Sequence, residues 1–240
     1  MKHITKSILL LTLLAAVTIL AGCSDPNSSI DPASPKGTWV ESIDFSEING
    51  FLSRSGNVIT LNYNAATDYS FLGNTGSFGF NRDVTESSCN GFEATMHKQS
   101  GNNGDRYEEY GFKCFVQHFG EDGFSYISVC IRHNSYALGS TRKESGSSYC
   151  PTTALKTVNG SGWIQDPVIN DGGENTVKVY KTQDNKIKFF INDKCVHTLD
   201  NAGNISGGVG IMWRVDMDYD AASGAEPVKV TYDFKKFLAE

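Results

Sequence analysis

The stretch NTVKVYKTQDNKIKFFINDKCVHTLDNAGNISGGVGIMW, Asn175–Trp213, contains the clearest strand pattern in this 240-residue chain. Apolar and polar residues alternate there over short runs, as in strands that bury one face. In the run KIKFFI, the stripe that we expect to be buried consists of Ile187, Phe189 and Ile191. Asn192-Asp193 follows, and both residue types tolerate positive φ. The stretch therefore predicts a hairpin with a two-residue turn.

Short runs of the same kind occur elsewhere in the chain: VITLNY, GFEATMHK, YGFKCFVQH, FSYISVCI and VKVTYDF. Turns rich in glycine and asparagine separate them, and the sequence shows no long amphipathic helix and no repeat of fixed period. Strands of this length and spacing are typical of an all-β sandwich. We therefore predict a single antiparallel domain over residues 37–240.

A second hairpin is predicted around Gly120-Glu121-Asp122-Gly123, which Phe119 and Phe124 flank. A three-residue loop closed by Gly123 would pair residues whose numbers sum to 244. One face then carries Phe115, Phe119, Ile127, Val129 and Ile131. The other face is partly polar and carries Tyr110, Phe112, Cys114, Val116, His118, Tyr126, Ser128, Cys130, Arg132 and Asn134.

Asn175–Trp213 and the later run VKVTYDFKKF together resemble the closing strands of the concanavalin A-like lectin/glucanase fold, which laminin G-like modules share. Ser206-Gly207-Gly208-Val209-Gly210-Ile211 matches the family's glycine-rich strand, whereas Asp193 stands where glycine is usual. The resemblance is good over residues 175–237 and loose over 91–131. It implies a two-sheet antiparallel jelly roll, but no particular reaction, because this fold carries binders, enzymes and spacers alike.

The polar face of the second hairpin is the candidate ligand site. If the run at 92–97 is its neighbour, then Glu93, Thr95 and His97 share this face. Carbohydrate sites combine aromatic rings with hydrogen-bonding side chains. Trp39 and Trp163 are expected to pack instead. The residues predicted to bind ligand are Glu93, His97, Tyr110, His118, Tyr126, Arg132, Asn134 and Trp213.

No catalytic residue is predicted. Glucanases of this fold place carboxylates on one strand face, but Glu41 and Asp44 differ by three positions and would point to opposite faces. On the candidate face Glu93 is the one carboxylate. A hydrolase would need a second carboxylate from a loop, and the candidates are Asp105, Glu108 and Glu109.

The sequence gives no reason to expect a metal ion or another cofactor. It contains no HxH, HExxH or CxxC pattern. Asp216, Asp218 and Asp220 alternate in a way that could offer oxygens to calcium. They lack the glycine and distal glutamate of a calcium-binding loop, so an acidic connecting loop is the favoured interpretation.

Five cysteines remain when Cys23 is set aside, so at least one of them must be unpaired. The hairpin register places Cys114 opposite Cys130 and makes this pair a disulfide candidate. A bond between directly opposite residues is strained. Cys89 and Cys150 form another conceivable pair that the pattern does not constrain.

The N-terminus has the pattern of an export signal: Lys2 and Lys6 precede an apolar run of thirteen residues, Ile8–Leu20. Leu20-Ala21-Gly22-Cys23 resembles the lipobox of bacterial lipoproteins, which implies cleavage before Cys23 and acylation of its thiol. We predict a signal peptide over 1–22 and a lipidated, proline-rich spacer over 23–36. The domain would then be tethered to a membrane outside the cytoplasm.

The formal charge of the chain is −6, and loss of both signal lysines would make it −8. No basic cluster is present, which argues against nucleic acid and against electrostatic docking on anionic lipid. The sequence thus predicts an envelope lipoprotein that binds a glycan or another surface ligand without catalysis. Two alternatives stay open: a glycoside hydrolase that uses Glu93 and a loop carboxylate, and a structural or adhesive surface protein.

Overall fold

The computed structural model describes residues 33–41, 52–63, 77–83, 89–100, 109–203, 205–216 and 228–239. They belong to the second of two compact units into which the chain divides, Met1–Asp31 and Pro32–Glu240. The predicted signal peptide and Cys23 lie outside the described residues, so their assignment stays a prediction. Nowhere in the described ranges is there a helix long and apolar enough to span a membrane.

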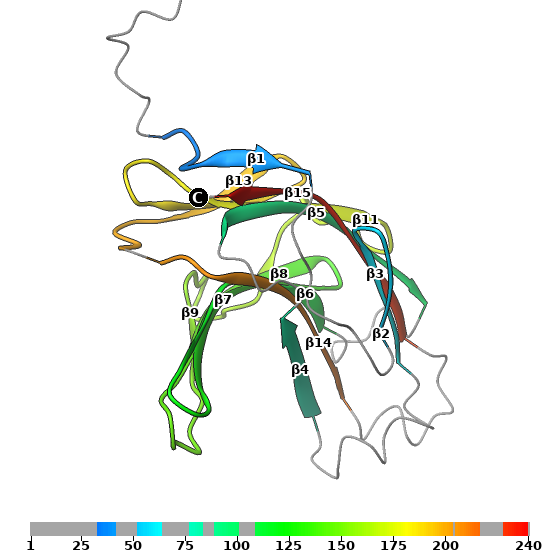
Figure 1. Ribbon diagram of the computed structural model, residues 1–240. Helices are drawn as coiled ribbons and strands as arrows, with labels where there is room; N and C mark the ends of the chain where they lie inside the picture. Colours follow the sequence, from blue (N-terminus) through cyan, green and yellow to red (C-terminus); the bar gives the residue numbers. More distant parts are fainter. Residues whose placement is uncertain are drawn as a thin grey trace, which may run out of the picture. The chain divides into compact units, whose positions relative to one another are not determined.

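One layer of the second unit is an eight-stranded antiparallel sheet (Figure 1). Its main path runs β13 (Lys194–Leu199), β12 (Ile187–Ile191), β11 (Glu174–Lys181), β5 (Cys89–Ser100), β15 (Val228–Ala239), β3 (Val58–Tyr63) and β2 (Leu52–Ser55). The short strand β1 (Thr38–Val40) pairs with the last residues of β15. The eight-stranded sheet thus brings together strands from both ends of the described chain.

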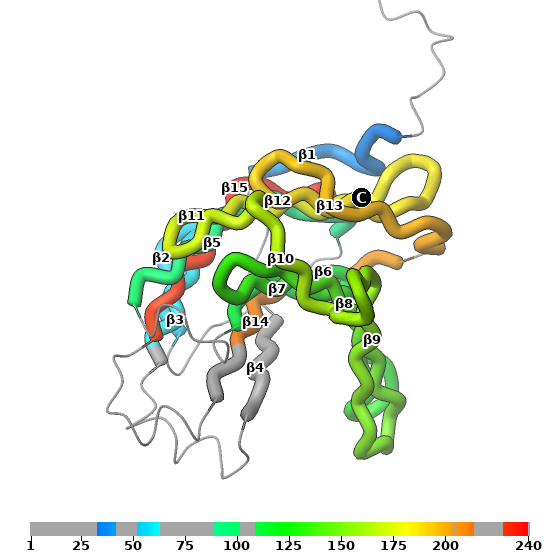
Figure 2. The backbone as a smooth tube through the Cα atoms, turned by 180° about the vertical axis from the view of Figure 1, so that it is seen from behind, coloured from blue at the N-terminus to red at the C-terminus, as the bar shows by residue number. Residues whose placement is uncertain are grey.

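The other layer is a seven-stranded antiparallel sheet, and Figure 2 shows the two layers from behind. Its path runs β10 (Ile164–Gln165), β8 (Ser135–Lys143), β7 (Gly123–Arg132), β6 (Glu109–Phe119), β14 (Gly208–Asp216) and β4 (Ser77–Asp83). The strand β9 (Thr152–Ala154) pairs with β8. The predicted all-β sandwich is confirmed.

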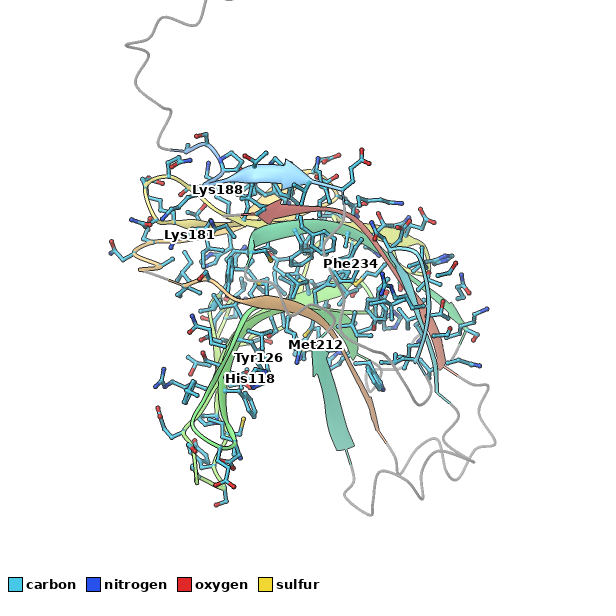
Figure 3. All side chains as sticks on the ribbon, in the orientation of Figure 1. His118, Tyr126, Lys181, Lys188, Met212 and Phe234 are labelled. Atoms are coloured by element: carbon cyan, nitrogen blue, oxygen red, sulfur yellow. The ribbon has the colours of Figure 1, made fainter. Side chains whose placement is uncertain are left out.

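The core lies between the sheets and is rich in aromatic rings. Phe92 of β5 packs against Phe112 of β6 at a centroid distance of 5.0 Å, which joins the two layers. Phe234 of β15, labelled in Figure 3, lies 5.4 Å from Phe112 and 6.0 Å from Phe92. These side chains are fully buried. Truncating one of them would cost about 3–5 kcal/mol of folding free energy.

The hairpin β12–β13 agrees with the prediction from its sequence. Ile187, Phe189 and Ile191 are completely buried. Asn192 and Asp193 form the turn with φ values of 46° and 64°, and Ile191 pairs with Lys194 across it. Alternation and turn chemistry point to the same register here, so the local pattern is sufficient.

The predicted register of the hairpin β6–β7 is wrong. Tyr110 pairs with Ile131, and Phe119 pairs with Gly123. The turn therefore spans residues 120–122, and its left-handed residue is Gly120, with a φ of 64°. In addition, Phe115 has a φ of 55° at a β-bulge, which shifts the register within β6. Because of this shift, Phe112 and Cys114 face the core instead of the predicted polar face.

The candidate disulfide between Cys114 and Cys130 is not formed. Cys114 is opposite Ile127 and belongs to the core, whereas Cys130 is opposite Gly111 on the outer face. Neither residue forms a disulfide bond, nor do the three other cysteines in the described part of the chain. Burial raises the pKa of the Cys114 thiol well above its ordinary value, and the nearby Cys89 adds to this effect.

Candidate ligand-binding pocket

The residues predicted to form one ligand surface are distributed over several parts of the sandwich. Glu93 and His97 lie on β5 in the eight-stranded sheet, whereas β6 and β7 belong to the seven-stranded sheet. The predicted adjacency is wrong because β5 and β6, although consecutive in sequence, pair into different sheets. Tyr110 and Trp213 are core residues, with exposed fractions of 6% and 1%.

Glu93 lies in a closed ionic cluster on the outer face of the eight-stranded sheet. Its carboxylate is 2.9 Å from Lys236 Nζ and 3.5 Å from Lys178 Nζ. The same two ammonium groups lie 5.2 and 5.5 Å from the ring centroid of Trp39. Glu93 thus holds two lysine ammonium groups beside a tryptophan ring. These contacts indicate that Glu93 stabilises the surface of this sheet.

A pocket of about 320 Å³ is present on the outer face of the seven-stranded sheet. Strands β6 to β9, β14 and the segment before β10 contribute to it. It is lined by Glu109, Tyr126, Ser128, Cys130, Ala137, Leu138, Gly139, Thr141, Thr152, Ala154, Gly162, Trp163 and Met212. Tyr126 and Met212 are labelled in Figure 3 on this sheet.

Side-chain size along the paired strands explains where the pocket forms. Outward positions alternate along a strand. Opposite Cys130 and Ser128 of β7 stand Ala137 and Gly139 of β8, and Gly139 in turn faces Ala154 of β9. Small side chains therefore meet at the centre of the face, and a recess remains there.

Tyr126 and Trp163 supply the aromatic part of the lining. Tyr126 stacks on Phe124 at 5.9 Å with an interplanar angle of 11°. Trp163 follows a turn in which its backbone amide donates to Ser161 Oγ over 3.1 Å. The guanidinium of Arg132 lies 4.1 Å from the Trp163 ring centroid. Each ring is thus held by a specific neighbour.

Glu109, Thr141 and Thr152 are polar residues of the lining, and Arg132, outside the lining, contacts Glu109 and Trp163. Arg132 Nη1 is 3.6 Å from Glu109 Oε1, and both side chains are partly exposed. Thr141 and Thr152 share a hydrogen bond of 2.8 Å between their hydroxyls. The lining therefore combines charged and hydroxyl groups that can accept or donate hydrogen bonds with small and apolar side chains.

Of the other residues predicted as ligands, His118 and Asn134 are exposed but do not line the pocket. His118 is opposite Phe124, towards the β6–β7 turn. Asn134 lies in the turn between β7 and β8. Their role as ligands stays a prediction.

Among the residues that line the pocket, Tyr126 is the one predicted ligand, and the sequence pattern does not indicate the others. The sequence assigns Trp163 to packing in the protein interior, and it gives no indication that Met212 or Thr141 lines a ligand site. The run SYALGSTRK, which forms β8, carries the missing signal: its outward residues include the small Ala137 and Gly139. Small outward residues in the middle of a strand indicate a depression in the sheet surface.

The acid–base chemistry that the pocket could perform is limited by the small number of carboxylates in its lining. Glu109 is the carboxylate in its lining, and it is ion-paired with Arg132. Within the described ranges, no group of three or more His, Cys, Asp or Glu side chains could hold a metal ion. Asp218 and Asp220, considered for calcium, lie outside those ranges, as do Asp105 and Glu108.

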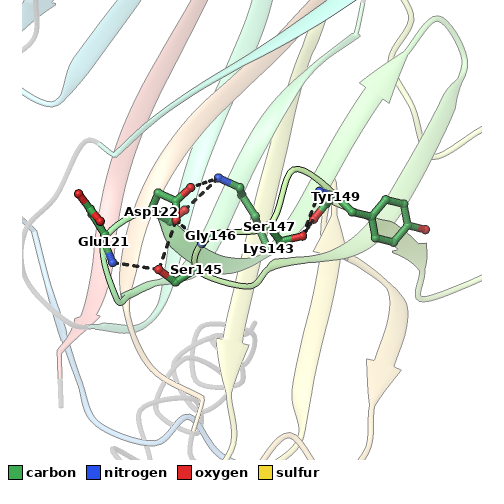
Figure 4. Close-up of polar contacts among 7 residues, drawn as sticks. All are labelled: Glu121, Asp122, Lys143, Ser145, Gly146, Ser147 and Tyr149. Carbon is green, nitrogen blue, oxygen red and sulfur yellow. Dashed lines mark hydrogen bonds and ion pairs between the residues drawn. The ribbon is translucent and has the colours of Figure 1, made fainter.

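The turn of the β6–β7 hairpin is tied to the segment after β8 by a polar network (Figure 4). Asp122 accepts hydrogen bonds from Lys143 Nζ at 2.5 Å and from the Gly146 amide at 2.7 Å. Ser145 Oγ accepts a bond from the Glu121 amide at 3.1 Å. The hydrogen bond from Lys143 is the largest cause that lowers the pKa of Asp122 to about 2. The network joins the ends of three strands that build the pocket.

No protein-family model matches the sequence, and no curated protein matches it. Among solved structures, the κ-carrageenase from Zobellia galactanivorans is similar, with a TM-score of 0.51, 11% identity and coverage of 84% of this chain and 88% of that chain. The κ-carrageenase from Pseudoalteromonas carrageenovora has a TM-score of 0.48 and 10% identity, over 88% and 99% of the two chains. Carbohydrate-binding module CBM66 from Bacillus subtilis has a TM-score of 0.39 and 14% identity, over 84% and 92%.

At this level of identity the likeness concerns the fold. The two antiparallel sheets match the jelly roll of the Zobellia galactanivorans protein, and the predicted fold class is confirmed. The chain is therefore similar in architecture to jelly-roll proteins of the concanavalin A-like class.

Proposed function

We propose that this protein is an envelope lipoprotein whose β-sandwich binds carbohydrate without cleaving it. The observation that carries the proposal is the pocket on the seven-stranded sheet, which Tyr126, Trp163 and Glu109 line, with Arg132 in contact with both Glu109 and Trp163. A sugar presents C–H groups on its ring faces and hydroxyls at its edge. Aromatic rings accommodate the first, and polar side chains the second.

Binding is favoured over hydrolysis by the number and position of carboxylates. Glycosidases of the common type use two, about 5–5.5 Å apart in retaining enzymes and about 6.5–9.5 Å apart in inverting ones. The described lining supplies Glu109 alone. Glu93, the acid that the hydrolase alternative requires, lies on the other sheet between Lys178 and Lys236.

The fold supports a carbohydrate ligand, although it does not distinguish binding from cleavage. The Zobellia galactanivorans protein is by its name an enzyme that acts on a carrageenan. Jelly rolls of this class serve both binding and hydrolysis, so only the residues of the pocket favour one of these functions over the other.

A glycan-array screen of the detergent-solubilised full-length protein tests the binding proposal. We expect binding to a restricted set of glycans, and its loss in the variant Trp163→Ala. The matched control is Trp39→Ala, which removes a tryptophan from the opposite sheet. Binding by neither wild type nor control would contradict the proposal and favour the structural or adhesive alternative. Release of new reducing ends from a bound glycan would instead favour a hydrolase.

Membrane attachment is a separate part of the proposal, and Leu20-Ala21-Gly22-Cys23 supports it. The short apolar run before Cys23 fits an export signal better than a spanning helix, which needs about 20 residues. We expect Cys23→Ala to move the protein from the membrane fraction to the soluble fraction. A variant that stays with the membrane would contradict lipid anchoring.

A further inference from the structure

The floor of the pocket is made by residues that have little or no side chain. Gly139 and Gly162 are part of it, as are Ala137 and Ala154. A Cβ atom at Gly139 would lie 2.9 Å from Ser128 Oγ and 3.0 Å from Thr152 Cγ2. A Cβ atom at position 162 would lie 3.2 Å from that of Ala154. The depth of the recess therefore depends on the absence of single methyl groups.

Two sulfur atoms complete the floor. Cys130 Sγ lies 3.4 Å from Met212 Sδ, in the geometry of a thiol that donates to a thioether. Thiols and thioethers are polarisable and form only weak hydrogen bonds. A methyl group would gain dispersion contacts with them. A hydroxyl placed over the two sulfur atoms would lose its bound water without a strong replacement, and this loss disfavours it there. The hydroxyl of Ser128 lies at the Gly139 side of the floor, so the preference for a methyl group arises at Cys130 and Met212.

The groups around the floor have the opposite character. Glu109 and Arg132 form their ion pair at the pocket, and the hydroxyls of Thr141 and Thr152 face each other over 2.8 Å. A ligand complementary to this arrangement has polar atoms that meet these groups and one apolar group that points inward. The volume of about 320 Å³ is near the lower end of ligand pockets, about 300–1,000 Å³, so it suits one end of a glycan.

We propose that the pocket selects a sugar that carries a methyl-terminated substituent and places that methyl group on the floor formed by Gly139, Ala154, Cys130 and Met212. This inference rests on the proposed carbohydrate binding. Two sources supply the same chemistry: the acetamido group of an N-acetylated sugar and the C6 methyl of a 6-deoxy sugar. Each differs from a common sugar by a group that the floor can contact.

Matched sugar pairs test this selectivity with the full-length protein in detergent. The pairs are N-acetylglucosamine with glucose, and L-fucose with L-galactose, and their affinities are measured by calorimetry. We expect at least one methyl-bearing sugar to bind about 10-fold more tightly than its partner. In saturation-transfer NMR, its methyl protons should receive the strongest transfer from the protein.

Two floor variants locate the contact. Gly139→Ala and Ala154→Leu add apolar atoms to the recess, and we expect each to reduce the preference within a pair to less than about 3-fold. Thr153→Leu is the control: it adds similar volume to β9, but its side chain alternates to the other side of the strand. Thermal unfolding of all three variants verifies that they are folded.

The outcomes separate this inference from the proposed function. Equal affinities within both pairs would overturn the methyl selectivity while carbohydrate binding stands. If the preference for the methyl-bearing sugar is unchanged in both floor variants, the methyl group does not contact the floor, and that part of the inference is wrong. Failure of every sugar to bind would overturn both proposals, and a preference that only the floor variants reduce would support both.

Discussion

The two outer faces of the sandwich each carry a tryptophan beside cationic groups, but they use this arrangement differently. On the eight-stranded sheet, Trp39 lies beside Lys178 and Lys236, which Glu93 joins. On the seven-stranded sheet, Trp163 lies beside Arg132 at a pocket. The difference is in the neighbours: long side chains cover the first face, whereas glycine and alanine leave the second face open. An aromatic–cation pair therefore indicates a ligand site only when the residues next to it are small.

The largest expected effect of this difference is on ligand binding. Removing the Trp163 ring should weaken the affinity for a bound glycan about 30-fold, because about 2 kcal/mol of ring burial and stacking is lost. Trp39→Ala should leave the affinity unchanged. Calorimetric titration of both variants measures the contrast, and equal losses would show that the two faces do not differ in function.

The second effect is on stability and has the opposite pattern. Trp39 makes an edge contact with Tyr180 at 6.3 Å in addition to its contacts with two lysines. We expect Trp39→Ala to lower the free energy of unfolding by about 1.5 kcal/mol. Trp163→Ala should cost less than this. Urea unfolding monitored by circular dichroism checks the order, and a larger loss in Trp163→Ala would contradict it.

The two glutamates give a smaller, charge-based contrast. Glu109→Gln should reduce glycan affinity by a few fold, since Arg132 loses its counter-ion at the pocket. Glu93→Gln should leave affinity unchanged and cost less than about 1 kcal/mol of stability, as is typical of partly exposed ion pairs. Affinity and unfolding measured at low and high salt test both statements. A fall in affinity with Glu93→Gln would reopen the hydrolase alternative.

The smallest expected effect concerns acid and the turn near the pocket. The pKa of Asp122 is lowered to about 2 from 3.8. The carboxylate therefore favours the folded turn above pH 3.8, and this contribution is lost as the pH falls through about 2. We expect faster amide exchange at Gly146 in Asp122→Asn than in wild type at pH 5, and a smaller difference near pH 2. A difference independent of pH would contradict the ionic interpretation.

The sequence predicted the strand pairing correctly in one hairpin, β12–β13, and incorrectly in another, β6–β7. In β12–β13 the alternation and the Asn192-Asp193 turn specify the same pairing, and the prediction is confirmed. In β6–β7 a phenylalanine, Phe115, adopts a left-handed conformation inside a strand. This conformation is rare for a bulky residue and leaves no mark in the alternation pattern. The register, and with it the placement of Cys114 and Cys130 on different faces, consequently could not be read from local sequence.

The candidate site was predictable only in part, because it depends on which strands share a sheet. Tyr126 lines the pocket and Arg132 contacts its tryptophan, as expected for outward residues of β7. Glu93 and His97 have the same local pattern but belong to the other sheet. Trp163 comes from a loop, where no periodicity indicates the direction of a side chain. Strand neighbours and loop positions are set by tertiary packing, and one sequence does not display them.

The pairing of β1 with β15 has a mechanical consequence. Thr38 is opposite Ala239, and just before β1 the Lys36 amide donates to the Lys181 carbonyl over 2.8 Å. The Gln183 amide also donates to the Ser34 carbonyl over 3.0 Å, so tension that enters through the chain before β1 first reaches this small group of hydrogen bonds. A three-residue strand at a sheet margin can detach without opening the aromatic core. If the protein is tethered as proposed, β1 would yield to a moderate pull and lengthen the tether, while the pocket on the opposite sheet stays intact.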